Sequence, residues 1–203
     1  MKKSINIAVV GLGQVGSYLL NELNTKKKDI ELKTGKKINV VAISARNINK
    51  KRQFRINKKI FFKNPLDIFS KTNVDILFEA IGLSDGISKK VVETALKKKI
   101  HVITPNKALI SKHGNELAKI AEQNNVNLEF EASVAGGIPI LRSIKEGLAT
   151  NKISKVYGIL NGTSNYILSE MENSNQSFAD VLKKAQKLGY AEPGNPKLDL
   201  NGF

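Results

Sequence analysis

The chain contains no cysteine and no tryptophan, and only two histidines, among its 203 residues. A chain without thiols cannot form disulfides, zinc–thiolate sites or iron–sulfur clusters, and it cannot use a cysteine nucleophile. Its histidines, His101 and His113, leave little from which to build a metal site of imidazoles. These absences exclude several classes of redox, metal and hydrolytic chemistry before any motif is considered.

Long apolar runs are absent as well. No segment approaches the roughly 18–20 apolar residues that a helix needs to cross a bilayer. The start of the chain is charged, and the apolar stretch before its first glycine is shorter than the core of a secretory signal. We therefore expect a cytoplasmic protein that has no membrane partner.

Acidic residues are scarce: 18 Asp and Glu stand against 33 Lys and Arg, which gives a formal net charge of +15. A basic surface can bind nucleic acid by releasing counterions from phosphates. However, 29 of the 33 basic residues are lysines spread along the whole chain, and the aromatic residues are not interleaved with them as a stacking surface requires. We expect no nucleic-acid partner; the alternative would show a steep salt dependence of DNA affinity.

The order of apolar segments predicts an α/β fold. We expect a doubly wound, Rossmann-type parallel sheet over residues 1–130, because short apolar strands alternate there with helical stretches. The expected strands cover residues 5–10, 38–44, 75–80, 100–104 and 128–132. The expected helices between them cover residues 88–98, 114–123 and a first segment with Val15, Tyr18, Leu19 and Leu23 on one face. Beyond this region we expect helices at 140–148, 165–171 and 178–188, and a strand at 155–160.

Gly11, Gly13 and Gly16 form a G-x-G-x-x-G motif, with Gln14 and Val15 between its last two glycines. The motif directly follows the first expected strand and opens the first expected helix. In this context the first glycine permits a tight turn, the second lets the backbone approach a pyrophosphate, and the third packs the helix closely on the strand. We expect these residues to bind a dinucleotide; the alternative is a purely structural turn.

The second expected strand ends without an acidic residue. A carboxylate at that position accepts a hydrogen bond from the ribose 2′-hydroxyl of NAD. Here Arg46 follows the strand, and Lys50, Lys51 and Arg52 come close behind. A cation there favours the 2′-phosphate of NADP, while NAD and a solvated lysine-rich loop stay open as alternatives.

Three later segments carry candidate polar groups. Lys107 follows the fourth expected strand, at the edge where ligands bind in such sheets, and could hold an oxygen or exchange a proton. Glu131 stands beside a glycine-rich turn whose carbonyl groups and single carboxylate could hold a monovalent cation; the alternative is a plain interdomain turn. Glu192 and Asp199 lie in a late polar loop, where they could bind an ammonium group or be exposed charges.

Taken together, the motifs resemble those of homoserine dehydrogenases. The resemblance rests on GLGQVG (11–16), TPNKALI (104–110), FEASVAGGIPI (130–140), GILNGTSNYIL (158–168) and AQKLGYAEP (185–193). It implies an oxidoreductase that interconverts L-aspartate 4-semialdehyde and L-homoserine by hydride transfer with NAD(P)H, in threonine and methionine biosynthesis. It also implies a NAD(P)-binding domain over 1–130 and part of an α+β catalytic and dimerisation domain over 131–203, from a family whose full-length members are homodimers.

The resemblance gives each candidate residue a role. It implies that residues 11–16 and Arg46 bind the cofactor, that Ser84 lies near the nicotinamide, and that Lys107 contacts cofactor and substrate as a supporting catalytic group. The implied sodium site consists of Glu131 with backbone groups of Val134, Gly136 and Ile138. The implied substrate pocket consists of Gly162, Thr163, Tyr190, Glu192 and Asp199.

The sequence departs from the family pattern near its end. Glu-x-Asp-Pro is replaced here by Glu192-Pro-Gly-Asn-Pro196, which is one residue longer before Asp199. The family continues past Asn-Gly with an aspartate and the lysine assigned as general acid/base, and this sequence stops at Phe203 before both. A second hypothesis is therefore a catalytically incomplete NADP-binding fragment or a nucleotide-binding module, which would bind NADP(H) without turnover. A chain extended to its natural end would consume the semialdehyde with NADPH under the first hypothesis.

Overall fold

The computed structural model describes residues 4–50, 52, 56–158 and 161–191 and divides the chain into two compact units, Met1–Gly136 and Gly137–Phe203. Each unit has buried apolar residues of its own. Within the described residues, no helix combines the length and the apolar character that crossing a bilayer requires.

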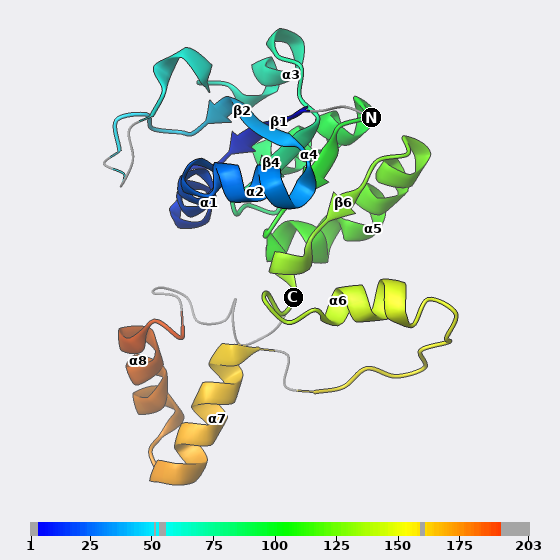
Figure 1. The fold of residues 1–203 in the computed structure, drawn as a ribbon. Coiled ribbons are helices and arrows are strands. Elements are labelled where there is room, and N and C mark those ends of the chain that lie inside the picture. Colours follow the sequence, from blue (N-terminus) through cyan, green and yellow to red (C-terminus); the bar gives the residue numbers. More distant parts are fainter. Residues whose placement is uncertain (1–3, 51, 53–55, 159–160, 192–203) are drawn as a thin grey trace. The chain divides into compact units, whose positions relative to one another are not determined.

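The first unit is built on a six-stranded parallel sheet in the order β3-β2-β1-β4-β5-β6 (Figure 1). The strands are β1 (Ser4–Val10), β2 (Lys37–Ser44), β3 (Phe61–Phe62), β4 (Ile76–Glu79), β5 (His101–Ile103) and β6 (Leu128–Glu129). Because β1 is flanked by β2 and β4, the strand order reverses there, which is where doubly wound sheets bind ligands. The predicted α/β parallel fold is confirmed.

Helices pack on both faces of this sheet. They are α1 (Gln14–Thr25), α2 (Lys27–Thr34), α3 (Ile68–Lys71), α4 (Ile87–Lys97) and α5 (Lys107–Gln123). Side chains alternate between the faces along β1. Ile7 and Val9 lie in the cluster that contains Leu19 of α1, whereas Ala8 and Val10 lie in the cluster that contains residues of α4 and α5.

Strand β2 contains one extra residue relative to β1. Ile7 pairs with Val40, and the next residue of β1, Ala8, pairs with Ala42. Val41 is thus the additional residue of a β-bulge. As a result Val40 and Ile43 pack on the same face of the sheet although they are three positions apart.

Several expected element boundaries in the first unit were wrong. Helix α5 begins at Lys107 rather than at 114, because the side chain of Asn106 caps it by accepting from the N–H of Leu109 at 3.1 Å. Helix α2 was not expected, because it has no buried residue and so no apolar periodicity. Val15 and Tyr18 do not lie on the packed face of α1; they are 52% and 65% exposed.

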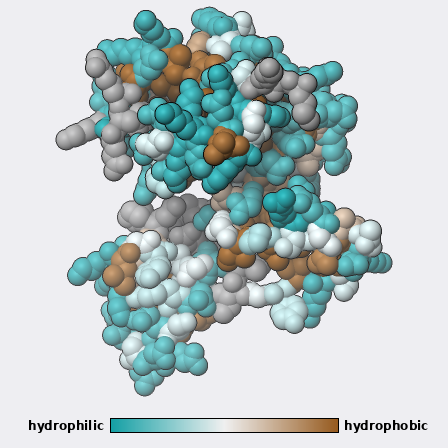
Figure 2. All heavy atoms as spheres, in the orientation of Figure 1, coloured by the Kyte–Doolittle hydropathy of each residue, from teal (hydrophilic) through white to brown (hydrophobic). Residues whose placement is uncertain are grey.

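The described part of the second unit is helical. Its elements are α6 (Ile140–Arg142), a π-helical turn η4 (Ser143–Gly147), α7 (Gly162–Ser174) and α8 (Phe178–Leu188). Helices α7 and α8 enclose Ile167, Val181 and Ala185. The strand expected at 155–160 was wrong for residues 155–158, which are exposed and have no strand to pair with among the described residues of this unit; residues 159–160 lie outside the described residues. In the visible face of this unit, apolar side chains gather over α6 (Figure 2).

Candidate functional site

Strand register brings the candidate cofactor residues to one edge of the sheet. Val10 of β1 pairs with Ser44 of β2 on one side and with Glu79 of β4 on the other. Phe78 of β4 pairs in turn with Ile103 of β5. The loops that follow these four strands therefore leave the same carboxyl edge, where ligands bind in parallel sheets.

Backbone crowding requires two of the three motif glycines. Gly11 has a φ of +94°, and a Cβ atom there would lie 2.3 Å from the carbonyl carbon and oxygen of Ala80. A Cβ atom on Gly16 would lie 1.9 Å from the carbonyl oxygen of Gly11. No side chain fits at either position, so both glycines hold the turn and the helix against the sheet, as the motif predicts.

The middle of the motif faces open space. No atom lies within 4 Å of a Cβ built on Gly13. Gly13, Gln14 and Val15 are exposed, α1 has no side-chain cap, and its first turn contains no acidic residue. The free N–H groups of this turn and the positive end of the helix dipole are therefore available to an anion, which fits a pyrophosphate.

The two arginines beyond β2 have different environments. Arg46 is exposed and forms no hydrogen bond or ion pair with the described residues. Arg52, in contrast, donates to the carbonyl oxygens of Asn47, Ile48, Lys50 and Leu12 at 2.8–3.3 Å. Arg46 thus has a guanidinium group that could bind a phosphate, whereas Arg52 joins its own loop to the glycine-rich loop. The sequence pattern places both arginines in one basic cluster, and it does not predict that Arg52 joins two loops.

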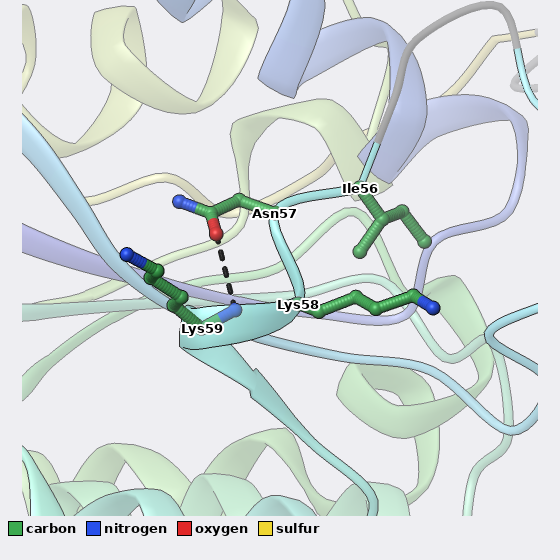
Figure 3. A pocket seen from close by; sticks show the side chains of 4 residues that line it. All are labelled: Ile56, Asn57, Lys58 and Lys59. Carbon is green, nitrogen blue, oxygen red and sulfur yellow. Dashed lines mark hydrogen bonds between the residues drawn. The ribbon is translucent and has the colours of Figure 1, made fainter.

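A pocket follows in the segment that leads into β3. It is lined by Ile56, Asn57, Lys58 and Lys59, and Asn57 Oδ1 accepts from the Lys59 N–H at 3.0 Å (Figure 3). The two lysine side chains run in opposite directions from the backbone in Figure 3. Only one polar contact joins the lining residues drawn there, and we assign the pocket no role.

A buried carboxylate lies at the end of β4. Glu79 is 0% exposed, and its Oε1 accepts from the Ile81 N–H at 2.8 Å and from Ser88 Oγ at 2.6 Å. Its Oε2 accepts from Thr104 Oγ1 at 2.6 Å, and Asn106 Nδ2 approaches it at 3.4 Å. We call Glu79, Ser88, Thr104 and Asn106 the Glu79 cluster; sequence reasoning missed it.

Lys107 is the first residue of α5 and follows the Glu79 cluster directly in the chain. It is exposed and forms no hydrogen bond or ion pair with the described residues. Its ammonium group is therefore available to a ligand at the carboxyl edge.

Ser84 lies in the loop between β4 and α4, and its hydroxyl donates to Asp85 at 2.6 Å. Asp85 also accepts from Lys112 at 2.7 Å and lies 2.9 Å from His113 Nε2. The bond from Lys112, and then those from Ser84 and His113, hold the pKa of Asp85 well below its usual range. The Ser84 loop is thus tied to α5 by an ionised carboxylate.

The residues proposed for sodium lie in an exposed segment. Glu131 begins a 3₁₀ turn, η3 (Glu131–Ser133), and Val134 and Gly136 follow it. No described residue donates a hydrogen bond to the carbonyl oxygens of Val134 and Gly136. Ile138 belongs to the second unit. Free carbonyl oxygens beside a carboxylate suit a hard cation; the described residues contain no group of three or more His, Asp or Glu side chains that could hold a metal ion.

Three of the five substrate candidates lie together within the second unit. Gly162 and Thr163 begin α7, which the Asn161 side chain caps, and Thr163 Oγ1 donates to the carbonyl oxygen of Tyr190 at 2.5 Å. The Tyr190 ring stacks on Tyr166 with 4.6 Å between centroids. The other two candidates, Glu192 and Asp199, lie outside the described residues.

Comparison with known proteins identifies relatives along the whole chain. The family model described as homoserine dehydrogenase, NAD binding domain, matches residues 11–131, and the model described as homoserine dehydrogenase matches residues 139–203. The homoserine dehydrogenase of Neisseria gonorrhoeae is 42% identical over 98% of this chain and 45% of the relative. That of Bacillus subtilis is 36% identical over 99% of this chain and 46% of the relative. The chain thus spans about half the length of the curated relatives it matches.

Solved structures agree. A homoserine dehydrogenase from Thiobacillus denitrificans superposes with a TM-score of 0.84 at 39% identity, covering 98% of this chain and 46% of the other. One from S. aureus superposes with a TM-score of 0.79 at 40% identity, covering 98% and 49%. A hyperthermophilic archaeal homoserine dehydrogenase in complex with NADPH shares the fold, with a TM-score of 0.78 at 23% identity, covering 98% and 65%.

Proposed function

This chain belongs to the homoserine dehydrogenase family, and we propose that it provides the cofactor-binding domain (residues 1–130) and the first part of the catalytic domain (131–203) of an enzyme that interconverts L-aspartate 4-semialdehyde and L-homoserine with NAD(P)H. One observation carries the proposal: the open glycine-rich loop and Lys107 follow strands that end at the same edge of the sheet. The proposed enzyme acts as a homodimer in the cytoplasm, in threonine and methionine biosynthesis.

The proposed cofactor preference is for NADP. The exposed Arg46 follows β2 at the position where an NAD-binding chain places a carboxylate. Guanidinium groups bind phosphates through charge-assisted, bidentate hydrogen bonds. Arg52 is engaged with backbone carbonyl groups, so Arg46 is the arginine that we assign to the 2′-phosphate.

In the proposed mechanism, the loop after β1 binds the cofactor, and the loops after β4 and β5 carry the residues beside the reacting groups. When bound, NADPH would supply the hydride that reduces the carbonyl carbon of the semialdehyde, and a proton from a lysine would neutralise the alkoxide that forms. The free N–H groups of residues 13–16 hold the pyrophosphate, and Ser84 lies beside the nicotinamide. The Lys107 ammonium group stabilises the negative charge that develops on the carbonyl oxygen.

For the substrate we propose the pocket of Gly162, Thr163 and Tyr190, completed by Glu192 and Asp199, whose carboxylates would bind the amino group. For sodium we propose Glu131 with the backbone of Val134, Gly136 and Ile138. The free carbonyl oxygens of Val134 and Gly136 support the second assignment.

Titration of the chain with NADPH and NADH tests the cofactor assignment. We expect Arg46→Ala to weaken NADPH binding at least about tenfold, because a charge-assisted bond to phosphate is lost, and to leave NADH binding nearly unchanged. Lys50→Ala removes an exposed cation from the same loop and is the matched control, with little effect on either ligand. Equal weakening of both cofactors by Arg46→Ala would refute the NADP assignment, and an unaltered chain that bound neither would refute dinucleotide binding.

The substrate is tested separately, by following NADPH oxidation in the presence of L-aspartate 4-semialdehyde. We expect the complete protein that contains this chain to consume both in equal amounts. A protein that bound NADPH but never oxidised it with this aldehyde would contradict the proposed reaction.

A further inference from the structure

The Glu79 carboxylate is fully buried and has no cationic partner among the described residues. Four neutral donors surround it: one backbone N–H, the hydroxyls of Ser88 and Thr104, and the Asn106 amide. Burying a carboxylate costs several kcal/mol unless its oxygens are hydrogen-bonded. The proposed mechanism makes no use of this group.

The donors belong to three segments of the carboxyl edge. Ile81 lies in the loop after β4, Ser88 lies in the first turn of α4, and Thr104 and Asn106 lie in the short link between β5 and α5. A single side chain thus joins the segments on the β4 and β5 side of the edge. The same segments carry Ser84 and Lys107.

Glu79 reaches Lys107 through two connected contacts. Thr104 Oγ1 donates its proton to Glu79 and accepts from the Asn106 N–H at 3.1 Å, so the carboxylate fixes the direction in which the hydroxyl accepts. Asn106 Nδ2 lies 3.4 Å from Glu79 and donates to the carbonyl oxygen of Leu83 at 2.8 Å. Asn106 is therefore held between the residue before Ser84 and the residue that begins α5.

We propose that Glu79 is a positioning residue for the nicotinamide half of the site: its charge orients Thr104 and Asn106, which place Lys107 and the 81–84 loop. The proposal rests on the proposed dinucleotide function and goes beyond it, because Glu79 is fully buried and would act through Thr104 and Asn106. A glutamine at this position would keep the shape but would offer only one acceptor oxygen. Its NH₂ group would face donors, and at least one buried donor would lose its partner.

The experiment compares two ligands on the 203-residue chain. NADPH covers the whole site, whereas 2′,5′-ADP carries only the adenosine half, which Arg46 and the glycine-rich loop would bind. We expect Glu79→Gln to weaken NADPH binding about tenfold and to leave 2′,5′-ADP binding within about twofold. Val92→Ala, a cavity in the buried face of α4, controls for loss of stability and should leave the ratio of the two dissociation constants unchanged.

Asn106→Ser provides a second route to the same result if Glu79→Gln fails to fold. Serine is a good N-cap, so α5 keeps its cap but loses the donor to Glu79 and Leu83. We expect the same selective loss of NADPH affinity, and no further loss when Glu79→Gln is added, because the two residues act through one connection.

The outcomes separate the two levels of the argument. An unaltered chain that binds neither ligand contradicts the proposed function itself. An unaltered chain that binds both, whose Glu79→Gln and Asn106→Ser variants change the two affinities equally, overturns the role of Glu79 alone.

Discussion

The two ends of the carboxyl edge are built in opposite ways. On the glycine side, residues 11–16, two glycines stand where a Cβ would clash with backbone, and the third, Gly13, faces open space that we assign to the cofactor. The Glu79 side is densely filled by a buried carboxylate and the side chains that donate to it. The difference shows that a site can be formed in two ways: by leaving no room for side chains, or by giving buried polar side chains hydrogen-bond partners. Only the first way leaves a short motif in the sequence.

We expect the largest effect on stability from Gly16→Ala, on the glycine side of the edge. The added Cβ would lie 1.9 Å from the Gly11 carbonyl oxygen, and backbone cannot move aside without disturbing β1. We expect the free energy of unfolding in urea to fall by about 3 kcal/mol, the upper end of the range for overpacking.

Gly114→Ala is the matched control for this change. Gly114 lies inside α5, where the new methyl would touch Ile110 at an ordinary 3.4 Å. Alanine should therefore stabilise the chain by up to about 1 kcal/mol. A similar loss of stability from both changes would remove the distinction between crowded and tolerant glycines.

Gly13→Asp should separate stability from binding. Aspartate is a favoured N-cap and complements the helix dipole, so we expect the free energy of unfolding to rise by about 0.5 kcal/mol. The same carboxylate would occupy the space that we assign to the pyrophosphate and would repel that group, which should weaken NADPH binding at least about a hundredfold. Gly13→Asn, a neutral cap of the same shape, should show a smaller loss of affinity. A variant that lost stability and kept its affinity would contradict the assignment of this open space to the cofactor.

The smallest expected effect is at the surface beyond the Glu79 side. The pKa of Asp85 is lowered in the folded chain by Lys112, Ser84 and His113, so its contribution to stability is present above its unfolded pKa of about 3.9 and is lost as the pH falls below it. In urea denaturation at pH 7, the free energy of unfolding of the wild type should therefore be higher than that of Asp85→Asn. The two values should converge at acidic pH. Because the Lys112–Asp85 ion pair is exposed, about 1 M salt should reduce the difference in stability between wild type and Asp85→Asn. A stability difference that grew as the pH fell would contradict the predicted direction of the pH dependence.

The fold was predictable where a helix buries an apolar face against a neighbouring element, because that burial leaves apolar periodicity in the sequence. Helix α8 begins and ends where the sequence predicts, and α4 differs by one residue at each end. Helix α2 could not be found in this way, since none of its residues is fully buried; ion pairs such as Lys33–Asp29 lie along its surface instead. Residues 155–158, part of the strand expected at 155–160, form no strand for a different reason: β-propensity is local, whereas a strand needs a partner.

The site was predictable in the same unequal way. The glycines have positional meaning, and Lys107 follows a strand, so both were visible in the sequence. Arg52 looks like its basic neighbours until its guanidinium is seen against backbone carbonyl groups. Glu79 left one usable signal, an acidic residue at the end of an apolar strand, but its partners Ser88, Thr104 and Asn106 are ordinary polar residues whose convergence depends on strand order.

The bulge at Val41 determines where strand β2 can lose one residue without losing its register with β1. Because Ala42 already pairs with the neighbour of the residue that Val40 pairs with, deleting Val41 would join two stretches that are each in phase with β1. Ile43 and Ser44 would keep their faces, and Arg46 would keep its place beyond the strand. Deleting Ala42 would bring Val41 opposite Ala8 and would leave the register of Ile43 and Ser44 unchanged as well, whereas deleting Ile43 would exchange inward and outward side chains at the end of β2. Positions 41 and 42 are thus those in β2 at which a single-codon deletion is tolerated best.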